Sequence, residues 1–392
     1  MLRRAGVIRT PKQSIIIPIF NGLRYLPYFW ATLCESIHVY SEVIIIDDGS
    51  SQDVFSSIPA FSSNVILKQI HHDKSQGYSS SINDGLKVSS GEYLFVVNSD
   101  IILFDNTLDV MRDELEHDDM IGCLGAKLLY PQTGRIQHFG VAFTETRKFH
   151  VFTHARPNNA LLKISRECQA VTFALCGFRR SVYEQLGPLS TKYRNSNEDI
   201  DYCLRARDHG FRNVVCANGV AYHWESQSGP TRFATNASNE AQFWTKWGEQ
   251  IVPDLTFYMK DSWHYMNNKL DYSGRYIIID LSKGNKTELN DLISVIGHSN
   301  VIEVWNYRQF NNSNYTLWLP MILPPDIIRS SIGLIYYIDE LPQILQNYYW
   351  FSMRKHYNTK DIIVDRYANI VYAHEEVYST APSRLKSTID VS

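Results

Sequence analysis

Long uninterrupted apolar runs are missing from this sequence of 392 residues. A helix that crosses a membrane needs about 20 predominantly apolar residues. The most apolar region of the second half, residues 317–338, is broken by prolines and charges: Pro320, Pro324, Pro325, Asp326 and Arg329. The basic N-terminus also lacks the continuous apolar segment of a signal peptide. We therefore expect a cytoplasmic protein without a transmembrane segment.

An excess of charge of either sign is also absent. The chain has 38 Lys and Arg residues against 41 Asp and Glu residues, for a net charge of −3 at pH 7. No global field therefore draws the protein to nucleic acid or to an anionic membrane. We expect no nucleic-acid partner, and any anionic ligand must be bound by local groups. Peripheral contact with a membrane surface stays open.

Paired cysteine motifs are the third absence. The six cysteines are scattered and form no CxxC pair; they are Cys34, Cys123, Cys168, Cys176, Cys203 and Cys216. Such spacing argues against both a disulfide framework and a zinc site. We expect reduced and mostly buried thiols.

The most informative stretch that is present is GEYLFVVNSD, residues 91–100. Residues 93–97 form a short apolar run rich in aromatic and β-branched side chains, which predicts a strand buried on both faces. The run stops at Asn98, Ser99 and Asp100. In open α/β sheets, ligands bind beyond the carboxyl ends of the strands, so Asp100 lies where a metal or polar ligand would be held. Taken alone, the same three residues are also an ordinary turn.

Other stretches alternate between strand and helix patterns. Strands are predicted at residues 14–19, 42–46, 65–69, 93–97, 121–129 and 214–222, and helices at 28–37, 77–88, 108–115, 181–187 and 198–210. The strand at 42–46 ends in Asp47 and Asp48, and the strand at 214–222 ends in His223. Residues 130–166 read as a variable loop or an edge hairpin. This alternation predicts an α/β fold with a doubly wound, mainly parallel sheet.

Six stretches of this chain, in order, carry a family signature within residues 13–230. They are SIIIPIFN, VIIIDDGS, GYSSSINDGL before GEYLFVVNSD, CGFRRSVYEQLGPL, NEDIDYCLRARDHGFR and VAYHWESQSG. Together they resemble the family-2 inverting glycosyltransferases with the GT-A fold, and an ordered set is far more specific than any single motif. The cysteine-glycine before the double arginine and the NSD sequence resemble the bacterial rhamnosyltransferase branch.

The resemblance implies a set of nucleotide-binding residues. Asp48 would accept a hydrogen bond from the uracil or thymine imide, and the main chain at Pro18 and Phe20 would cover the base. Gly77, Ser99 and Asp100 complete the nucleotide-binding set. Asp100 matches the acid that binds Mg²⁺ or Mn²⁺ across the two phosphates. Ser99 stands where many relatives have another acid, and His223 matches a histidine that joins the metal.

The resemblance also assigns the general base. Asp199 matches the carboxylate that takes a proton from the acceptor hydroxyl as that hydroxyl attacks the anomeric carbon. Glu198, Arg179 and Arg180 are weaker candidates for contacts with acceptor or phosphate. Acids in a first helical turn and arginines at a helix start also have ordinary structural explanations. The implied partners are a nucleotide-sugar donor and a glycan or lipid-linked acceptor.

The family signal ends near residue 250. We expect a glycosyltransferase domain at 1–250, a connector at 251–270 and a C-terminal accessory α/β domain at 271–392. In the C-terminal domain, strands are predicted at 276–281, 301–305, 332–338, 362–364 and 370–373, and helices at 289–296 and 341–349.

Three functions are compatible with these patterns. The first is transfer of a sugar from a UDP- or dTDP-sugar, and it is favoured because Asp48, Asp100 and Asp199 are all present. The second is a sugar-phosphate nucleotidyltransferase, which would normally show a glycine-rich loop with a basic residue after the first strand. The third is a catalytically silent glycan-binding scaffold.

Overall fold

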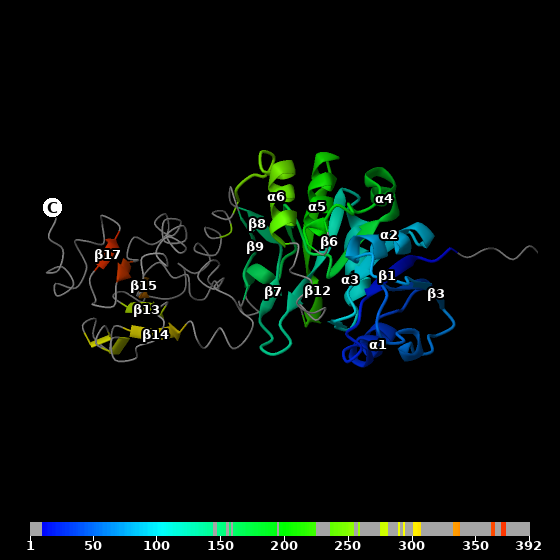
Figure 1. Ribbon diagram of the computed structural model, residues 1–392, viewed down its shortest axis with the longest axis horizontal. Helices are drawn as coiled ribbons and strands as arrows, with labels where there is room; N and C mark the ends of the chain where they lie inside the picture. The colour runs from blue at the N-terminus through cyan, green and yellow to red at the C-terminus, as the bar shows by residue number, and fades with distance from the viewer. Residues whose placement is uncertain are drawn as a thin grey trace, which may run out of the picture. The chain divides into compact units, whose positions relative to one another are not determined.

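The chain divides into two compact units, Met1–Asp254 and Leu255–Ser392. The computed structural model describes residues 10–143, 147–153, 157, 160–193, 196–224, 236–254, 258, 275–280, 289–290, 293–294, 301–306, 332–337, 362–364 and 370–373. Each unit contains its own sheet. Figure 1 shows the elements of both units, and each unit is described here by itself.

A ten-stranded sheet forms the centre of the N-terminal unit, with the main order β10-β12-β6-β11-β4-β1-β2-β3 and with β5 paired to β12 and β7 to β6. The strands are β1 (Gln13–Ile19), β2 (Ser41–Asp47), β3 (Val65–His71), β4 (Tyr93–Val97), β5 (Ile101–Leu103), β6 (Ile121–Leu129), β7 (Ile136–His138), β10 (Arg166–Cys168), β11 (Leu175–Arg179) and β12 (Arg212–His223). All residues of β1, β2 and β4 are buried. The predicted strands buried on both faces are therefore confirmed.

The direction of the strands decides which ends reach the site. β3, β2, β1 and β4 are mutually parallel. β11 is antiparallel to both β4 and β6, and β12 is parallel to β6. Six strands therefore run one way, and β11 runs against them in the middle of the sheet. The predicted α/β fold with a mainly parallel, doubly wound sheet is confirmed.

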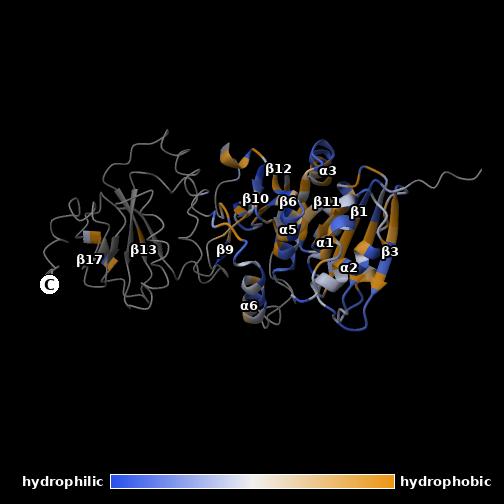
Figure 2. Cartoon of the chain, turned by 90° about the horizontal axis from the view of Figure 1, so that it is seen from above, coloured by the Kyte–Doolittle hydropathy of each residue, from blue (hydrophilic) through white to orange (hydrophobic). Residues whose placement is uncertain are grey.

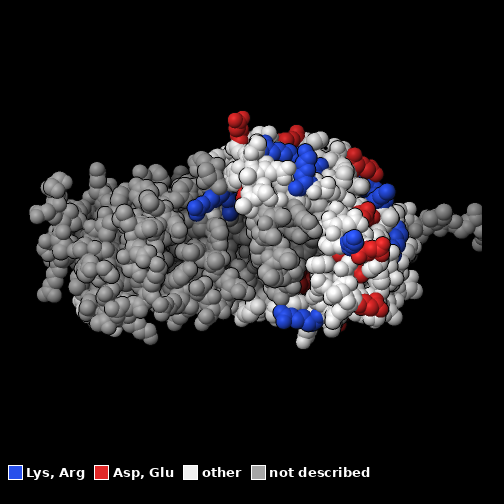
Figure 3. Space-filling model, viewed as in Figure 1, with Lys and Arg blue, Asp and Glu red and all other residues white. Residues whose placement is uncertain are grey.

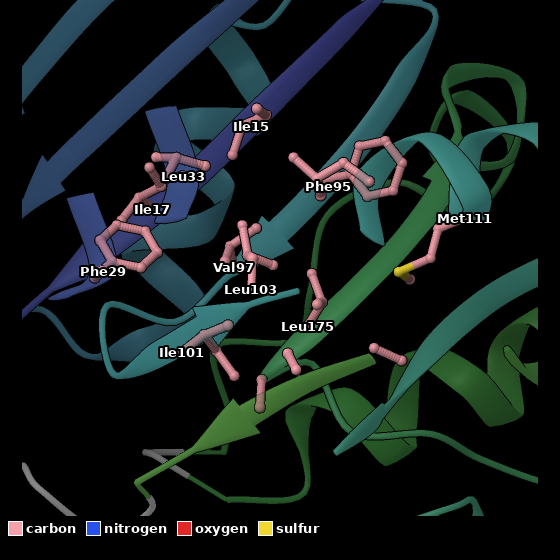
Figure 4. Close-up of a cluster of buried hydrophobic side chains, with 14 of the residues drawn as sticks. Ile15, Ile17, Phe29, Leu33, Phe95, Val97, Ile101, Leu103, Met111 and Leu175 are labelled. Carbon is pink, nitrogen blue, oxygen red and sulfur yellow. The ribbon is translucent and has the colours of Figure 1, made fainter. Parts of the chain in front are cut away.

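Helices cover both faces of this sheet. α1 (Leu26–Glu35) and α3 (Thr107–His117) pack on one face, where their apolar residues share a core with alternate residues of β1, β2 and β4. Figure 4 shows this core, with Phe29 and Leu33 of α1 beside Ile15 and Ile17. Burying each such side chain contributes roughly 1.5–3 kcal/mol. Figure 2 shows apolar residues gathered on the strands, with hydrophilic loops around them.

The opposite face carries α2 (Tyr78–Val88), α4 (Arg180–Leu186) and α5 (Glu198–Asp208). α2 approaches the sheet so closely at Gly85 that an added Cβ would lie 2.6 Å from Cγ2 of Ile16. α5 contributes Tyr202, whose ring contacts Phe173 and Phe178. The last helix of the unit is α6 (Asn236–Trp247). None of the helices in the described part of the chain has the length and apolarity that a bilayer crossing requires.

The described residues of the stretch 130–166 contain more regular structure and are more buried than the sequence suggested. They contain β7, which extends the main sheet, and a separate two-stranded sheet of β8 (Val141–Phe143) and β9 (Lys148–His150). All three residues of β8 are buried. Short 3-10 turns occur at Phe55–Ser57 and Ala160–Leu162. The expected edge hairpin is therefore present, but it packs into the unit.

The C-terminal unit holds a five-stranded sheet of order β14-β13-β15-β16-β17. Its strands are β13 (Arg275–Asp280), β14 (Val301–Asn306), β15 (Ile332–Tyr337), β16 (Ile362–Val364) and β17 (Ile370–Ala373). All pairs are parallel except β16 with β17. The predicted strands are confirmed to within a residue or so. The helix predicted at 341–349 lies outside the described residues.

Candidate active site

Asp100 and His223 meet at the carboxyl edge of the N-terminal sheet. β4 ends at Val97, and after the turn that carries Asp100 the chain enters β5, which pairs antiparallel with the end of β12. In this pairing Ile101 lies opposite His223, and the backbone N–H of Trp224 donates to the backbone oxygen of Asp100 at 3.1 Å. Nε2 of His223 lies 3.4 Å from Oδ1 of Asp100. The short strand β5, which the sequence did not reveal, therefore assembles this pair.

The chemistry of this pair fits a divalent cation. Nε2 of His223 is buried and makes no hydrogen bond to the described residues, and it faces a carboxylate oxygen. Imidazole nitrogen and carboxylate oxygen are both ordinary ligands of Mn²⁺, and Mg²⁺ takes carboxylate together with substrate phosphates. The described residues contain no group of three or more His, Cys, Asp or Glu that could hold a metal by themselves.

Asp199 is connected to this edge by hydrogen bonds of the segment that leads into β11. Its Oδ2 accepts a hydrogen bond from the backbone N–H of Phe173 at 3.3 Å. The next residue, Ala174, accepts a hydrogen bond from the N–H of Asn98 at 2.8 Å. The hydroxyl oxygen of Tyr78 lies 2.8 Å from Oδ1 of Asn98 and 2.8 Å from the backbone oxygen of Phe173. Asp199 is only partly buried. The structure thus links Asp199 to the turn that carries Asp100.

The three acids of the first turn of α5 have different surroundings. Asp201 is fully buried and accepts hydrogen bonds from Arg205, Lys246 and Trp247. Glu198 is buried. Asn197, the residue before the helix, has a left-handed backbone with φ of 72°, which is uncommon for a residue other than glycine. Asp199 is the most accessible of these acids, and its role as base stays a prediction.

Asp48 lies at the end of β2, where the sequence placed it, but its carboxylate is occupied by the chain. Oδ1 accepts from Nδ1 of His72 and from the N–H of Gln76, and Oδ2 accepts from the hydroxyl of Ser75 and from the N–H of Gly77. Burial raises the pKa of Asp48, but these four hydrogen bonds outweigh it and lower the pKa below its usual value. Asp48 therefore shapes the loop before α2, and its contact with a base stays a prediction.

The remaining nucleotide-binding candidates lie near the same edge. Pro18 is buried in β1, Phe20 follows that strand and is partly exposed, and Ser99 is partly exposed beside Asp100. Gly77 precedes α2 with φ of 94°, a conformation that suits glycine. A cavity of about 200 Å³ lies beside this helix start. These predicted residues thus lie near the carboxyl ends of several strands. The contacts of these residues with a nucleotide stay predictions.

Arg179 and Arg180 lie at the opposite edge from Asp100, and their predicted contact with acceptor or phosphate stays a prediction. Because β11 runs antiparallel to β4, Arg179 is paired with Tyr93, the first residue of β4. Its guanidinium donates to the hydroxyl of Tyr93, and that of Arg180 donates to the backbone oxygen of Gly91. Both arginines therefore tie the end of β11 and the start of α4 to the start of β4, a strand's length away from Asp100.

Lys148 is a cation near Asp199 that sequence reasoning missed. It forms an ion pair with Glu240 of α6 and lies over the ring of Phe243 at 4.9 Å. Burial lowers the pKa of Lys148, while Glu240 and Asp199 act in the opposite direction. A single lysine in an irregular stretch of sequence does not indicate a role. The position of Lys148 becomes apparent only from the packing of β9 against α6. On the face drawn in Figure 3, acidic and basic side chains of the described residues are interspersed.

Comparison with known proteins identifies a family for part of this chain. Residues 14–187 match the sequence model of the family described as "Glycosyl transferase family 2". Residues 14–187 therefore contain a glycosyl transferase family 2 domain, and the predicted family is confirmed. Neither this match nor the relatives below identify the rhamnosyltransferase branch, which stays a prediction.

The individual relatives have low sequence identity to this chain, and they are much longer than it is. The uncharacterized protein y4gI of Sinorhizobium fredii is 30% identical over 232 residues, covering 56% of this chain and 25% of that protein. The O-antigen biosynthesis protein RfbC of Myxococcus xanthus is 28% identical over 255 residues, covering 62% of this chain and 19% of that protein. The chain thus spans about a quarter or less of these two relatives.

Among solved structures, the mannosyltransferase PcManGT from Pyrobaculum calidifontis in complex with GDP-Man and Mn²⁺ is 15% identical. The superposition has a TM-score of 0.47 and covers 63% of this chain and 66% of that one. A superposition this loose supports no conclusion about the site.

Proposed function

We propose that the N-terminal domain transfers a sugar from a nucleotide-sugar, a UDP- or dTDP-sugar, to a hydroxyl of a glycan or lipid-linked saccharide, with inversion at the anomeric carbon. The observation that carries the proposal is the pair of Asp100 and His223 at the carboxyl edge of the sheet, 3.4 Å apart. Membership of glycosyl transferase family 2 supports it. The name of the O-antigen relative supports a glycan acceptor.

Asp100 and His223 would hold a divalent cation, Mg²⁺ or Mn²⁺, together with the donor diphosphate. Such a cation neutralises charge that develops on the leaving nucleoside diphosphate. The described residues at this edge support the assignment because they offer two ligand atoms that lie 3.4 Å apart. Asp48, Gly77, Pro18, Phe20 and Ser99 would shape the surface that meets the nucleoside.

Asp199 would act as general base. The acceptor oxygen forms a bond to the anomeric carbon while the bond from that carbon to the diphosphate oxygen breaks on the opposite face. The acceptor proton passes to the carboxylate of Asp199. Phe173 donates to Oδ2 of Asp199 and Ile200 to Oδ1, and these contacts fix the carboxylate. Lys148 lies near enough for its charge to interact with Asp199.

The C-terminal unit, residues 255–392, is proposed to be an accessory domain that positions the acceptor or mediates assembly. Its described strands form a sheet of their own. Truncation after residue 254 would test this proposal, since an acceptor-positioning domain affects transfer but not donor hydrolysis.

A screen of nucleotide-sugars tests the enzymatic proposal. Purified full-length protein is incubated with UDP-, dTDP- and GDP-sugars, with and without Mn²⁺, and the release of nucleoside diphosphate is measured. We expect slow release from one donor that Mn²⁺ accelerates and that Asp199→Asn reduces. Binding of glycans without release from any donor, in the presence of candidate acceptors, would instead favour the glycan-binding scaffold.

A further inference from the structure

We infer that Gln137 is a positioning residue that holds His223 in the tautomer whose Nε2 lone pair faces Asp100. The inference rests on the proposed role of His223 as a metal ligand. Gln137 lies in β7 and is only 5% exposed. The family signature did not include it, and it lies in the stretch that the sequence presented as a loop or edge hairpin.

The side-chain amide of Gln137 contacts His223 twice. Nε2 of Gln137 donates to the backbone oxygen of His223 at 3.2 Å, and Oε1 of Gln137 lies 2.7 Å from Nδ1 of the histidine ring. The side chain of Gln137 therefore contacts both the main chain and the ring of His223. This double contact fixes the position of the ring as well as its rotation.

The donors and acceptors of these contacts determine where the proton lies. A backbone oxygen only accepts hydrogen bonds, so the amide nitrogen of Gln137 must be the atom that faces it. The amide oxygen of Gln137 consequently faces Nδ1 of His223, and that oxygen also only accepts. Nδ1 must therefore carry the hydrogen. In a neutral ring, Nε2 then has a lone pair and no hydrogen.

Nε2 of His223 has the surroundings of a ligand atom without its cation. It is buried, it makes no hydrogen bond within the described part of the chain, and it lies 3.4 Å from Oδ1 of Asp100. Two acceptor atoms that face each other are stabilised by a positive charge shared between them. Metal-binding histidines commonly have their other ring nitrogen held by an oxygen, which fixes the tautomer and strengthens metal binding. Gln137 supplies that oxygen.

His138, the neighbouring residue in β7, has other partners and does not position the ring of His223. His138 accepts hydrogen bonds at Nε2 from the N–H groups of Gly140 and Thr172, and its Nδ1 faces His150. Successive residues of a strand point to opposite faces, so Gln137 points toward His223 and His138 points away from it. β7 is itself paired with β6, which holds the backbone of Gln137 in place.

A pair of buried glutamines allows a matched experiment. Gln169 is 6% exposed, and its side chain bonds Arg207 and Val252 instead of His223. Mn²⁺ binding is measured by calorimetry in the presence of UDP, without turnover, for the wild type, Gln137→Met and Gln169→Met. We expect Gln137→Met to weaken Mn²⁺ binding by about 10- to 100-fold. Gln169→Met should retain the wild-type affinity even if it lowers the melting temperature.

Gln137→Glu tests whether the acceptor oxygen of residue 137, and not the rest of the side chain, is what supports Mn²⁺ binding. Glutamate keeps an oxygen for Nδ1 of His223, so it should restore most of the Mn²⁺ affinity that Gln137→Met loses. Equal affinities for the wild type and Gln137→Met, or equal losses for Gln137→Met and Gln169→Met, would overturn the inference.

The tautomer itself can be observed without metal or substrate. In protein labelled with ¹⁵N-histidine, the signals of His223 are assigned by comparison with His223→Gln. The hydrogen on Nδ1 in the wild type, and its loss from that position in Gln137→Met, would support the inference. A hydrogen on Nε2 in the wild type would overturn it. If the wild type binds no Mn²⁺ even with UDP, the proposed metal site fails, but the tautomer result still decides the role of Gln137.

Discussion

Nζ of Lys246 lies 2.6 Å from Oδ1 of Asp201, and this ion pair ties α6 to the first turn of α5. The indole nitrogen of Trp247 donates to the same oxygen at 2.9 Å. Asp201 is completely buried, so its carboxylate holds helices together and is not open to an acceptor. Asp199, two residues earlier, lacks such a set of side-chain donors among the described residues.

Asp201→Asn should therefore reduce stability and leave chemistry largely intact. Breaking one side of a buried ion pair leaves uncompensated charge, so we expect a loss of about 2–4 kcal/mol in the free energy of unfolding. Urea denaturation measures this loss. Turnover per folded molecule should stay near the wild-type value. A large loss of turnover at unchanged stability would instead identify Asp201 as the base.

Asp199→Asn should have the opposite effect. The amide keeps the shape and the hydrogen-bonding capacity of a helix start but cannot take a proton, so turnover should fall by roughly a hundredfold or more. The donor dissociation constant and the melting temperature should change little, since Asn serves about as well as Asp at such a position. Near-normal turnover would leave Glu198 as the next acid to change.

Asp100→Ala should remove most of the metal-dependent binding of nucleoside diphosphate. The substitution leaves His223 as the only described side chain of the pair, so UDP affinity in the presence of Mn²⁺ should fall about tenfold or more. Calorimetry with and without Mn²⁺ measures the difference. Asp105→Ala, which changes an exposed acid just after β5, is the control. Unchanged affinity for UDP with Mn²⁺ would contradict the assignment of the metal site.

Asp48→Ala should weaken nucleoside binding whether or not metal is present. The carboxylate orders the loop from His72 to Gly77, so we also expect a lower melting temperature. Binding of uridine to folded protein, measured without Mn²⁺, separates the two effects. Asp73→Ala changes an exposed acid in the same loop and should bind uridine normally. An effect seen only with metal would mean that the roles of Asp48 and Asp100 are exchanged.

His138 should make stability depend on pH between about 5 and 7. Burial lowers the pKa of His138 well below its usual value, and the charges of His150 and His223 lower it further. Below pH 6.5 the unfolded chain therefore binds a proton that the folded protein does not. The free energy of unfolding should fall as pH decreases in this range, by up to about 1.4 kcal/mol per pH unit. Urea denaturation at several pH values measures the slope.

The matched control for that slope is another histidine. His138→Gln should flatten the pH dependence, while His117→Gln, which changes an exposed histidine of α3, should keep the wild-type slope. Identical slopes for all three proteins would show that His138 does not set this dependence.

Elements with a clear residue pattern could be predicted from sequence. β1, β2 and β4 are apolar runs with polar ends, and the pattern fixes both the strand and the place where it stops. β5 and β7 have only three residues each, which is too short for any periodicity. These two strands are nevertheless the ones that bring His223 to Asp100 and Gln137 to His223.

The position of Arg179 could not be predicted for a similar reason. The sequence predicted no strand before the double arginine, and the direction of a strand depends on its neighbours in the sheet. β11 runs against β4, so its carboxyl end lies at the edge away from Asp100. The occupied carboxylate of Asp48 could not be predicted either, because its donors come from a loop whose path depends on the start of α2.

The reversed strand β11 also has a mechanical consequence. Its entry segment is hydrogen-bonded to Asn98 on one side, through Ala174, and to Asp199 on the other, through Phe173. Two adjacent residues thus act as a stiff spacer between the turn that carries Asp100 and the helix that carries Asp199. Both residues lie in the turn directly before β11, and both are buried. The separation between the groups that hold the donor and the group that deprotonates the acceptor is therefore set by backbone, and a lengthened spacer would misalign the two even with every side chain intact.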